Sequence, residues 1–160
     1  KVAERHINVT SSPKYEGDDL IGIGATHFAK KGMDVIIYSG DKDLLQLVSP
    51  AISVWRPLTG TTQKFEVHNW ENFKKLNNNY EPDQLRELKG LIGDRSDSIP
   101  GIKELFHKTS HRLIKKYKTL DNIYDNLDEL DKDTKRILVS KKEIAYISLD
   151  VGTVARKKRK

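Results

Sequence analysis

A nearly unbroken apolar run from Met33 to Tyr38 constrains the fold of this chain more than any other feature of its sequence. Such a run is typical of a parallel strand that is covered on both faces of its sheet. A shorter β-favouring run, 7–9, precedes it. Between the two, Asp18 or Asp19 could begin a helix that ends at the cations and glycine of 30–32. Strand, helix and strand in this order predict a doubly wound α/β sheet.

The remaining pattern predicts a hairpin followed by helices. A leucine-rich helix over 44–47 follows the apolar strand, and two β-favouring runs between 52 and 67 read as a hairpin. The proline that opens 82–92 suits the first turn of a helix. Several short helices come next, and 132–147 is expected to be one helix. We therefore expect a partly parallel sheet flanked by helices, followed by an all-helical region.

The composition restricts the classes of protein and of site. The chain has 160 residues, enough to bury a core, and a formal net charge of +6. A basic balance favours a polyanionic partner, because neutralising phosphates releases counterions. The absence of cysteine excludes disulfide scaffolds, thiolate zinc sites and cysteine nucleophiles. No apolar run approaches the roughly 20 residues of a membrane helix, so we expect no membrane association.

Carboxylates gather in three clusters, each at a predicted element boundary. The clusters are 15–19 (Tyr-Glu-Gly-Asp-Asp), 40–43 (Gly-Asp-Lys-Asp) and 93–97 (Gly-Asp-Arg-Ser-Asp). The first two follow predicted strands, and in open α/β sheets the carboxyl ends of the strands share one edge, the usual place for a site. Seven carboxylates would converge there if the third cluster folds against the other two.

Such a gathering of acids needs cations. Like charges at close range raise the pKa values of the carboxyls and destabilise the fold. Hard oxygen ligands without cysteine point to Mg²⁺ or Mn²⁺ rather than to zinc. Two such ions about 4 Å apart suit hydrolysis of a phosphodiester, one activating water and the other stabilising the leaving oxygen.

Each cluster also has a plainer interpretation. Glu16, Asp18 and Asp19 could be a helix cap with acids that match the helix dipole. Asp41 and Asp43 could form a turn and an N-cap, and the third cluster could be an Asx-rich turn. Three clusters in this order, each at a boundary, favour the metal site over these separate explanations.

Three longer motifs resemble those of one family. Residues 15–22, Tyr-Glu-Gly-Asp-Asp-Leu-Ile-Gly, are similar to its Y-E-A-D-D-L-I-G, and 39–47, Ser-Gly-Asp-Lys-Asp-Leu-Leu-Gln-Leu, to its T-G-D-K-D-L-L-Q-L. Residues 88–101 resemble L-K-A-L-M-G-D-x-S-D-N-I-P-G. The family is that of the bacterial and phage 5′–3′ exonucleases, or flap endonucleases, which includes the 5′-nuclease domain of DNA polymerase I. The resemblance runs from about Ile7 to Leu127.

The resemblance implies a PIN-like core and a structure-specific nuclease that hydrolyses DNA near 5′ ends with two Mg²⁺ or Mn²⁺ ions. The main metal ligands and catalytic carboxylates would be Glu16, Asp18, Asp19 and Asp41. A second, more open metal position would be completed, partly through water, by Asp43, Asp94 and Asp97, with Asp43 also counted as catalytic. Lys42 could offset charge or contact a phosphate, and a solvated turn lysine explains it equally well.

The segment from Ser98 to Tyr117 resembles the family's helix–three-turn–helix module, which grips the duplex backbone. This chain has Glu104 and Phe106 where the family has two glycines that let backbone amides approach phosphate. The substitutions weaken the case for the K⁺ ion that the resemblance implies at this hairpin. Direct phosphate contacts could compensate. The DNA-binding residues would be Lys42, Gly101, Lys103, Lys108, Thr109, Arg112, Lys115 and Lys116.

The resemblance also implies a division of the chain. Residues 1–80 would be the C-terminal part of the α/β nuclease core, 81–150 the helical DNA-binding region and 151–160 a basic tail. The family begins with a strand that ends in a metal-binding aspartate, followed by a basic helical arch. We therefore expect that the chain lacks its N-terminal part, and that it is poorly active or inactive as this fragment.

The expected partners are branched, nicked or gapped duplex DNA and a polymerase domain or the N-terminal segment. We expect a monomer inside the cell, in the cytoplasm, the nucleoid or a DNA-containing organelle. Two alternatives stay open: a DNA-binding module without catalysis, and a PIN-like ribonuclease that shares the acidic α/β arrangement. Metal-dependent cleavage of matched DNA and RNA substrates distinguishes the three.

Overall fold

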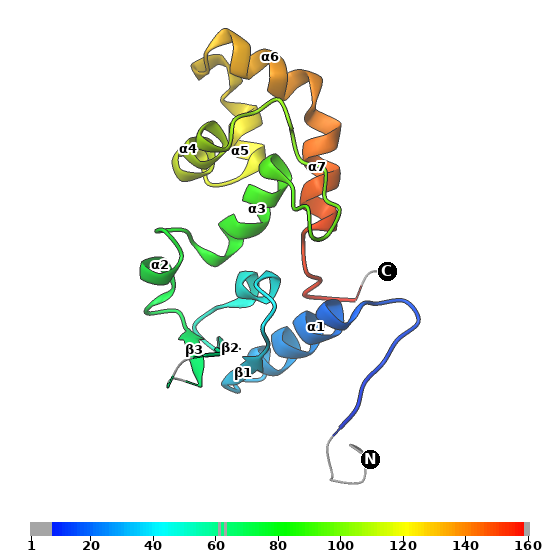
Figure 1. Cartoon of the computed structure of the whole chain (residues 1–160). Helices are drawn as coiled ribbons and strands as arrows, with labels where there is room; N and C mark the ends of the chain where they lie inside the picture. Colours follow the sequence, from blue (N-terminus) through cyan, green and yellow to red (C-terminus); the bar gives the residue numbers. More distant parts are fainter. Residues whose placement is uncertain (1–7, 61, 63, 159–160) are drawn as a thin grey trace.

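The computed structural model describes residues 8–60, 62 and 64–158. A small sheet with helix α1 (Gly17–Lys30) against it lies at one end, and a stack of helices lies at the other (Figure 1). In the described sheet, β1 (Val35–Tyr38) is parallel to β2 (Ile52–Pro57), which is antiparallel to β3 (Phe65–His68). The predicted hairpin and the predicted fold class, a partly parallel sheet followed by helices, are confirmed.

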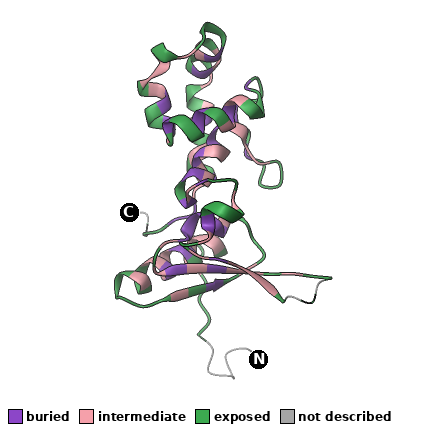
Figure 2. Cartoon of the chain, turned by 90° about the vertical axis from the view of Figure 1, so that its left-hand side faces the viewer, coloured by how far each residue is buried: buried purple, intermediate pink, exposed green. Residues whose placement is uncertain are grey.

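Strand β1 is covered on one face only, so the prediction of two covered faces is wrong. Ile37 is buried in the core, whereas Ile36 and Tyr38 are 56% and 65% exposed. Alternating burial is the pattern of a sheet with one open face. The mixture of buried and exposed residues along the sheet is visible in Figure 2. β1 is also an edge strand of the described sheet.

Two further elements differ from the doubly wound pattern. The leucine-rich segment forms a 3₁₀ helix, η2 (Asp43–Leu47), instead of an α-helix. Residues 44–47 are all buried, and because successive side chains of a 3₁₀ helix point in three directions, this short helix is covered on every side. Of the predicted strand 7–9, residue 7 lies outside the described residues, and Asn8 and Val9 are not in a strand.

Helix α1 has the predicted position, and its buried residues are small. His27 and Phe28 are exposed, and the buried positions are the small residues Gly22 and Ala25. A Cβ at Gly22 would overlap the carbonyl oxygen of Ala155. Small side chains therefore let the C-terminal part of the chain lie close against this helix.

The rest of the chain is helical. Its elements are α2 (Phe73–Leu76), α3 (Pro82–Ile92), α4 (His107–Tyr117), α5 (Leu120–Asp125), η3 (Leu127–Glu129), α6 (Lys132–Ser140) and α7 (Lys142–Val151). The prediction of one helix over 132–147 is wrong, because Lys141 leaves the helical conformation at φ −116° and ψ 16°. Leu138 before the break and Ala145 after it both lie in the helical core. Among the described residues, no helix has the length and apolarity needed to cross a membrane.

Helix α3 connects the two ends of the molecule. Its side chain Leu85 packs against both the core around the sheet and the core among the helices. Gln84 donates from Nε2 to the carbonyl oxygen of Ile114 at 2.9 Å, and Glu87 accepts from the backbone N–H of Leu120 at 2.9 Å. These buried polar contacts orient α4 and α5 relative to α3.

After α7 the chain returns to the sheet and lies beside α1 (Figure 1). We refer to residues 152–156 as the C-terminal strap. The buried amide of Gln46 donates to the carbonyl oxygen of Gly152 at 3.1 Å and accepts from the N–H of Val154 at 3.0 Å. Arg156, which lies in the predicted basic tail 151–160, pairs with Asp83 at 2.8 Å. This part of the predicted tail therefore packs against the folded chain.

The close contact between α1 and the C-terminal strap gives a matched pair of variants. Gly22→Ala should lower the free energy of unfolding by about 1–3 kcal/mol, because the new methyl group overlaps the strap. Gly24→Ala, in the same helix with nothing within 4 Å of its added Cβ, should raise it by about 0.5–1 kcal/mol. Urea unfolding of both variants measures the difference, and equal effects would contradict the packing described here.

Candidate metal centre

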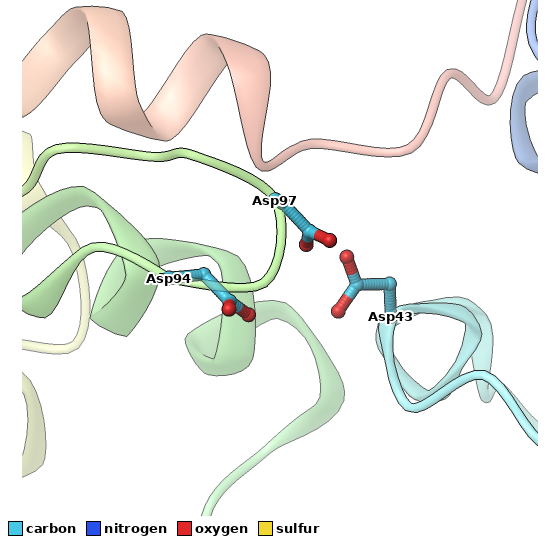
Figure 3. Close-up of side chains that lie close together, drawn as sticks. All are labelled: Asp43, Asp94 and Asp97. Atoms are coloured by element: carbon cyan, nitrogen blue, oxygen red, sulfur yellow. The ribbon is translucent and has the colours of Figure 1, made fainter.

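Three carboxylates meet where the sheet end and the helical end of the molecule adjoin. Asp43 begins η2, whereas Asp94 and Asp97 lie in the turn that follows α3. One oxygen of each lies within 4.8 Å of the other two, and Figure 3 shows the three side chains directed toward one another. Among the described residues, this is the only group of three or more His, Cys, Asp or Glu side chains that comes so close together.

The turn after α3 places its two aspartates by short backbone hydrogen bonds. Asp94 and Ile99 exchange N–H to carbonyl bonds of 2.9 and 2.8 Å. Gly93 and Gly101, at φ 76° and 57°, close the turn, and a Cβ on either would overlap backbone atoms. The N–H of Gly101 donates to Ser148 Oγ at 3.0 Å. Gly101, predicted to contact DNA, therefore uses its amide inside the protein.

Lys89, in the last turn of α3, places its ammonium among these three carboxylates. Its Nζ lies 2.5 Å from Asp43 Oδ2, 3.0 Å from Asp94 Oδ2 and 3.0 Å from Asp97 Oδ2. Burial alone would lower the pKa of Lys89, but its hydrogen bonds with the three acids outweigh burial and raise that pKa. The lysine therefore stays protonated.

The pKa values of Asp94 and Asp43, two of the acids around Lys89, shift in opposite directions. The Ser96 hydroxyl, followed by Lys89, lowers the pKa of Asp94 to about 2. Burial raises the pKa of Asp43 even though Lys89 acts against it. Lys89 lies within the 88–101 motif but is not among the predicted site residues. Its position five and eight residues before Asp94 and Asp97 was the available clue.

The remaining predicted ligands form a second group around Asp18 and Asp41. Burial raises the pKa of Asp18, and the charge of Asp41 and a hydrogen bond with it raise that pKa further, with smaller contributions from Glu16 and Asp19. Asp41 Oδ1 also accepts from the N–H of Asp43 at 2.8 Å. Asp41 thus connects this group to the one around Lys89.

Asp19 is held by a hydrogen bond from a distant part of the backbone. Its Oδ1 accepts a 2.9 Å hydrogen bond from the backbone N–H of Ala155, in the C-terminal strap. A backbone donor carries no residue-specific pattern, so only the folded chain reveals it. The seven predicted carboxylates therefore lie in two connected groups, and neither group is held by the sheet alone.

The donor set of both groups fits a divalent ion of the Mg²⁺ or Mn²⁺ class. Every candidate ligand is a carboxylate oxygen, which hard cations prefer. Burial is the main cause of the raised pKa of Asp18, and the neighbouring carboxylates raise that pKa further, so a bound cation would relieve their repulsion. Around Asp43, a lysine ammonium already supplies a positive charge.

The predicted DNA-binding side chains lie mainly on one side of α4. Exposed positions among them are Lys42, Lys103, Lys108, Arg112, Lys115 and Lys116, and Thr109 is half-buried. Those on α4 line a surface depression together with Phe106, whose exposed fraction is 81%. Lys116 is partly engaged by Glu129 at 2.8 Å, and Glu104 pairs with Lys141 at 2.8 Å. The patch remains basic and contains one exposed aromatic ring.

Both parts of the chain match known families. Residues 2–80 match the family described as 5′-3′ exonuclease, N-terminal resolvase-like domain, and residues 80–159 match 5′-3′ exonuclease, C-terminal SAM fold.

The chain also resembles individual proteins. A 5′-3′ exonuclease of Mycoplasma genitalium is 42% identical over 131 residues, which is 82% of this chain and 45% of that protein. DNA polymerase I of Chloroflexus aurantiacus is 34% identical over 151 residues, which is 93% of this chain and 16% of that protein. The chain thus spans about half the length of the similar exonuclease and a smaller share of the polymerase.

Solved structures of phage proteins share the fold. The flap endonuclease of bacteriophage T5, in a complex with DNA and metal ions, superposes with a TM-score of 0.76 at 18% identity, over 96% of this chain and 55% of that one. The T5 5′-exonuclease with bound zinc gives a TM-score of 0.76 at 19% identity, over 94% of this chain and 54% of that one.

The Asp94 pKa predicts part of the acid sensitivity of the metal-free protein. Because the folded-state pKa of about 2 lies below the ordinary 3.8, ionised Asp94 stabilises the fold above about pH 4, and this contribution is lost as the pH falls toward 2. The free energy of unfolding of the wild type should fall between about pH 6 and about pH 2.5, partly because Asp94 becomes protonated. In Asp94→Asn this fall should be smaller by about 1 kcal/mol, a value that allows for screening by solvent.

Urea unfolding in EDTA at the two pH values measures this contribution. Asp125→Asn, at an exposed acid on α5, is the matched control and should leave the pH dependence close to that of the wild type. An unchanged pH dependence in Asp94→Asn would contradict the assignment.

Proposed function

This chain belongs to the 5′-3′ exonuclease family, and on that premise we propose that it carries the metal centre and the DNA-binding helices of a structure-specific 5′–3′ exonuclease or flap endonuclease. The observation that carries the proposal is the pair of connected carboxylate groups in a chain that also has a basic face on α4. A carboxylate centre suits phosphodiester hydrolysis, and a basic face suits a polyanionic duplex.

The two groups divide the proposed metal ligands between them. Glu16, Asp18, Asp19 and Asp41 would hold one Mg²⁺ or Mn²⁺ ion, and Asp43, Asp94 and Asp97 would hold the second. Such ions, when bound, supply an activated water and neutralise charge on the scissile phosphate. Within the protein, Asp41 couples the two groups through its bond to the Asp43 amide, and the C-terminal strap holds Asp19.

The basic residues of α4 and Lys103 would position the duplex through its phosphates, which gives affinity with little sequence preference. Glu104 and Phe106 supply side chains where backbone amides would otherwise be open to phosphate, so the proposal relies on lysine and arginine contacts and includes no K⁺ ion. The proposed substrates are branched, nicked or gapped duplexes. The proposed state is a monomer inside the cell, where DNA is present.

Cleavage of a 5′-labelled flap duplex tests the enzymatic part. The 160-residue chain and the longest natural polypeptide that contains it are compared, each with Mg²⁺, with Mn²⁺ and with EDTA. Asp41→Ala should lower cleavage by about 10²-fold or more, because it removes a ligand and uncouples the two groups. Asp125→Ala should cleave as the wild type does.

The other outcomes of this assay identify the alternatives. Equal cleavage of a matched RNA substrate would indicate a ribonuclease. Duplex binding without metal-dependent cleavage by either wild-type protein would reject the nuclease and leave a DNA-binding module.

Salt dependence of duplex binding tests the basic helix face. The double variant Lys108→Ala/Arg112→Ala should bind more weakly, and the slope of log affinity against log salt should become shallower by about 2, because each lost phosphate contact removes about 0.9. The control is Lys75→Ala/Lys132→Ala, which removes the same charge from exposed positions outside the patch. Equal slopes in the two double variants would contradict a specific interface on α4.

A further inference from the structure

We propose that Lys89 is a built-in competitor for the divalent ion at Asp43, Asp94 and Asp97, so that this ion enters only when the lysine ammonium moves aside. The inference rests on the proposed function, which assigns these carboxylates to a metal. It explains why the second metal position would bind a divalent ion weakly in the DNA-free protein and more tightly when a DNA phosphate is present.

Competition follows from the atoms that the ammonium uses. Lys89 Nζ contacts Oδ2 of each of the three aspartates at 2.5–3.0 Å. A bound Mg²⁺ would require carboxylate oxygens at about 2.0–2.1 Å, drawn from the same close group. Two cations cannot share these oxygens without strong repulsion in a partly buried place. The ammonium and the ion therefore exclude one another.

The placement of Lys89 is built into the packing around its side chain. The lysine is only 16% exposed, and its Cβ and Cδ lie 3.2 and 3.1 Å from the position that a Cβ on Gly152 would take. The absence of a side chain at Gly152, in the C-terminal strap, leaves room for the lysine stem. The methylene groups of Lys89 are therefore confined between α3 and the C-terminal strap. Only the ammonium end of the side chain can move aside.

The charges explain what competition would achieve. In the metal-free protein, the ammonium compensates part of the charge of three neighbouring carboxylates, which would otherwise repel one another. A divalent ion must displace the Lys89 ammonium, and the free energy of this displacement lowers the affinity for the ion. A phosphate oxygen from DNA adds negative charge at the site and so favours the divalent ion. Loading of the second position would then depend on the substrate.

Direct titration with Mn²⁺ tests the competition without any catalytic readout. Calorimetry on the 160-residue chain, without DNA, compares the wild type, Lys89→Met, Lys89→Arg and Lys75→Met. Lys89→Met keeps the length of the stem and removes the charge, so its weaker Mn²⁺ site should tighten by about tenfold or more. Lys89→Arg keeps a positive charge beside the carboxylates, so it should bind Mn²⁺ as weakly as the wild type does. Lys75→Met, at an exposed lysine on α2, should match the wild type.

Thermal unfolding provides a second measurement. Without metal, Lys89→Met should unfold at a lower temperature than the wild type, because the carboxylates lose their counter-charge. Saturating Mn²⁺ should raise its midpoint more than it raises that of the wild type, since tighter binding to the folded state stabilises it more. A lower midpoint that Mn²⁺ does not correct would show a purely structural lysine and overturn the proposal.

The failure of this inference differs from failure of the nuclease proposal. Metal-dependent DNA cleavage together with an unchanged or weaker Mn²⁺ affinity in Lys89→Met would reject competition and keep the nuclease. Tighter Mn²⁺ binding in Lys89→Met without any cleavage would keep competition and reject the nuclease. No measurable Mn²⁺ binding by any of the four proteins would reject competition, and the flap-cleavage assay on both wild-type proteins would still decide the nuclease proposal.

Discussion

Packing acidic side chains together is costly unless positive charge compensates them, and this constraint organises the junction between the two ends of the molecule. Lys89 supplies the charge for one carboxylate group by reaching from α3 to η2. The same helix joins the two hydrophobic cores through Leu85. The element that balances the acids is thus also the one that orients the helices against the sheet. Helix α3 therefore both stabilises the fold and carries the lysine that contacts the candidate metal ligands.

The local elements could be predicted where the signal lies within a few residues. The proline at position 82 correctly marked the start of α3. What could not be predicted depends on long-range packing. Lys89 and Asp43 are 46 residues apart in the sequence, and the donor to Asp19 is a backbone amide without a characteristic side chain. A motif locates such ligands but does not show what holds them.

Burial of the strands illustrates the same limit. An apolar run such as Met33–Tyr38 indicates a strand, but the exposure of Ile36 and Tyr38 depends on what lies over each face of the sheet. Likewise, continuous helical periodicity over 132–147 does not reveal the break at Lys141, because the apolar side chains on both sides of it pack into one core as they would along an unbroken helix. Periodicity therefore gives the type of element more reliably than its surroundings.

The C-terminal strap has a consequence for how the molecule is made. Asp19 and its donor at Ala155 are separated by 136 residues, so a ribosome adding about 5–20 residues per second completes this pair many seconds after Asp19 itself has been synthesised. During that interval the nascent chain carries its first acidic cluster without the backbone amide that holds it. Asp19 is therefore fixed by this bond only after the C-terminal strap has been synthesised and has packed against α1.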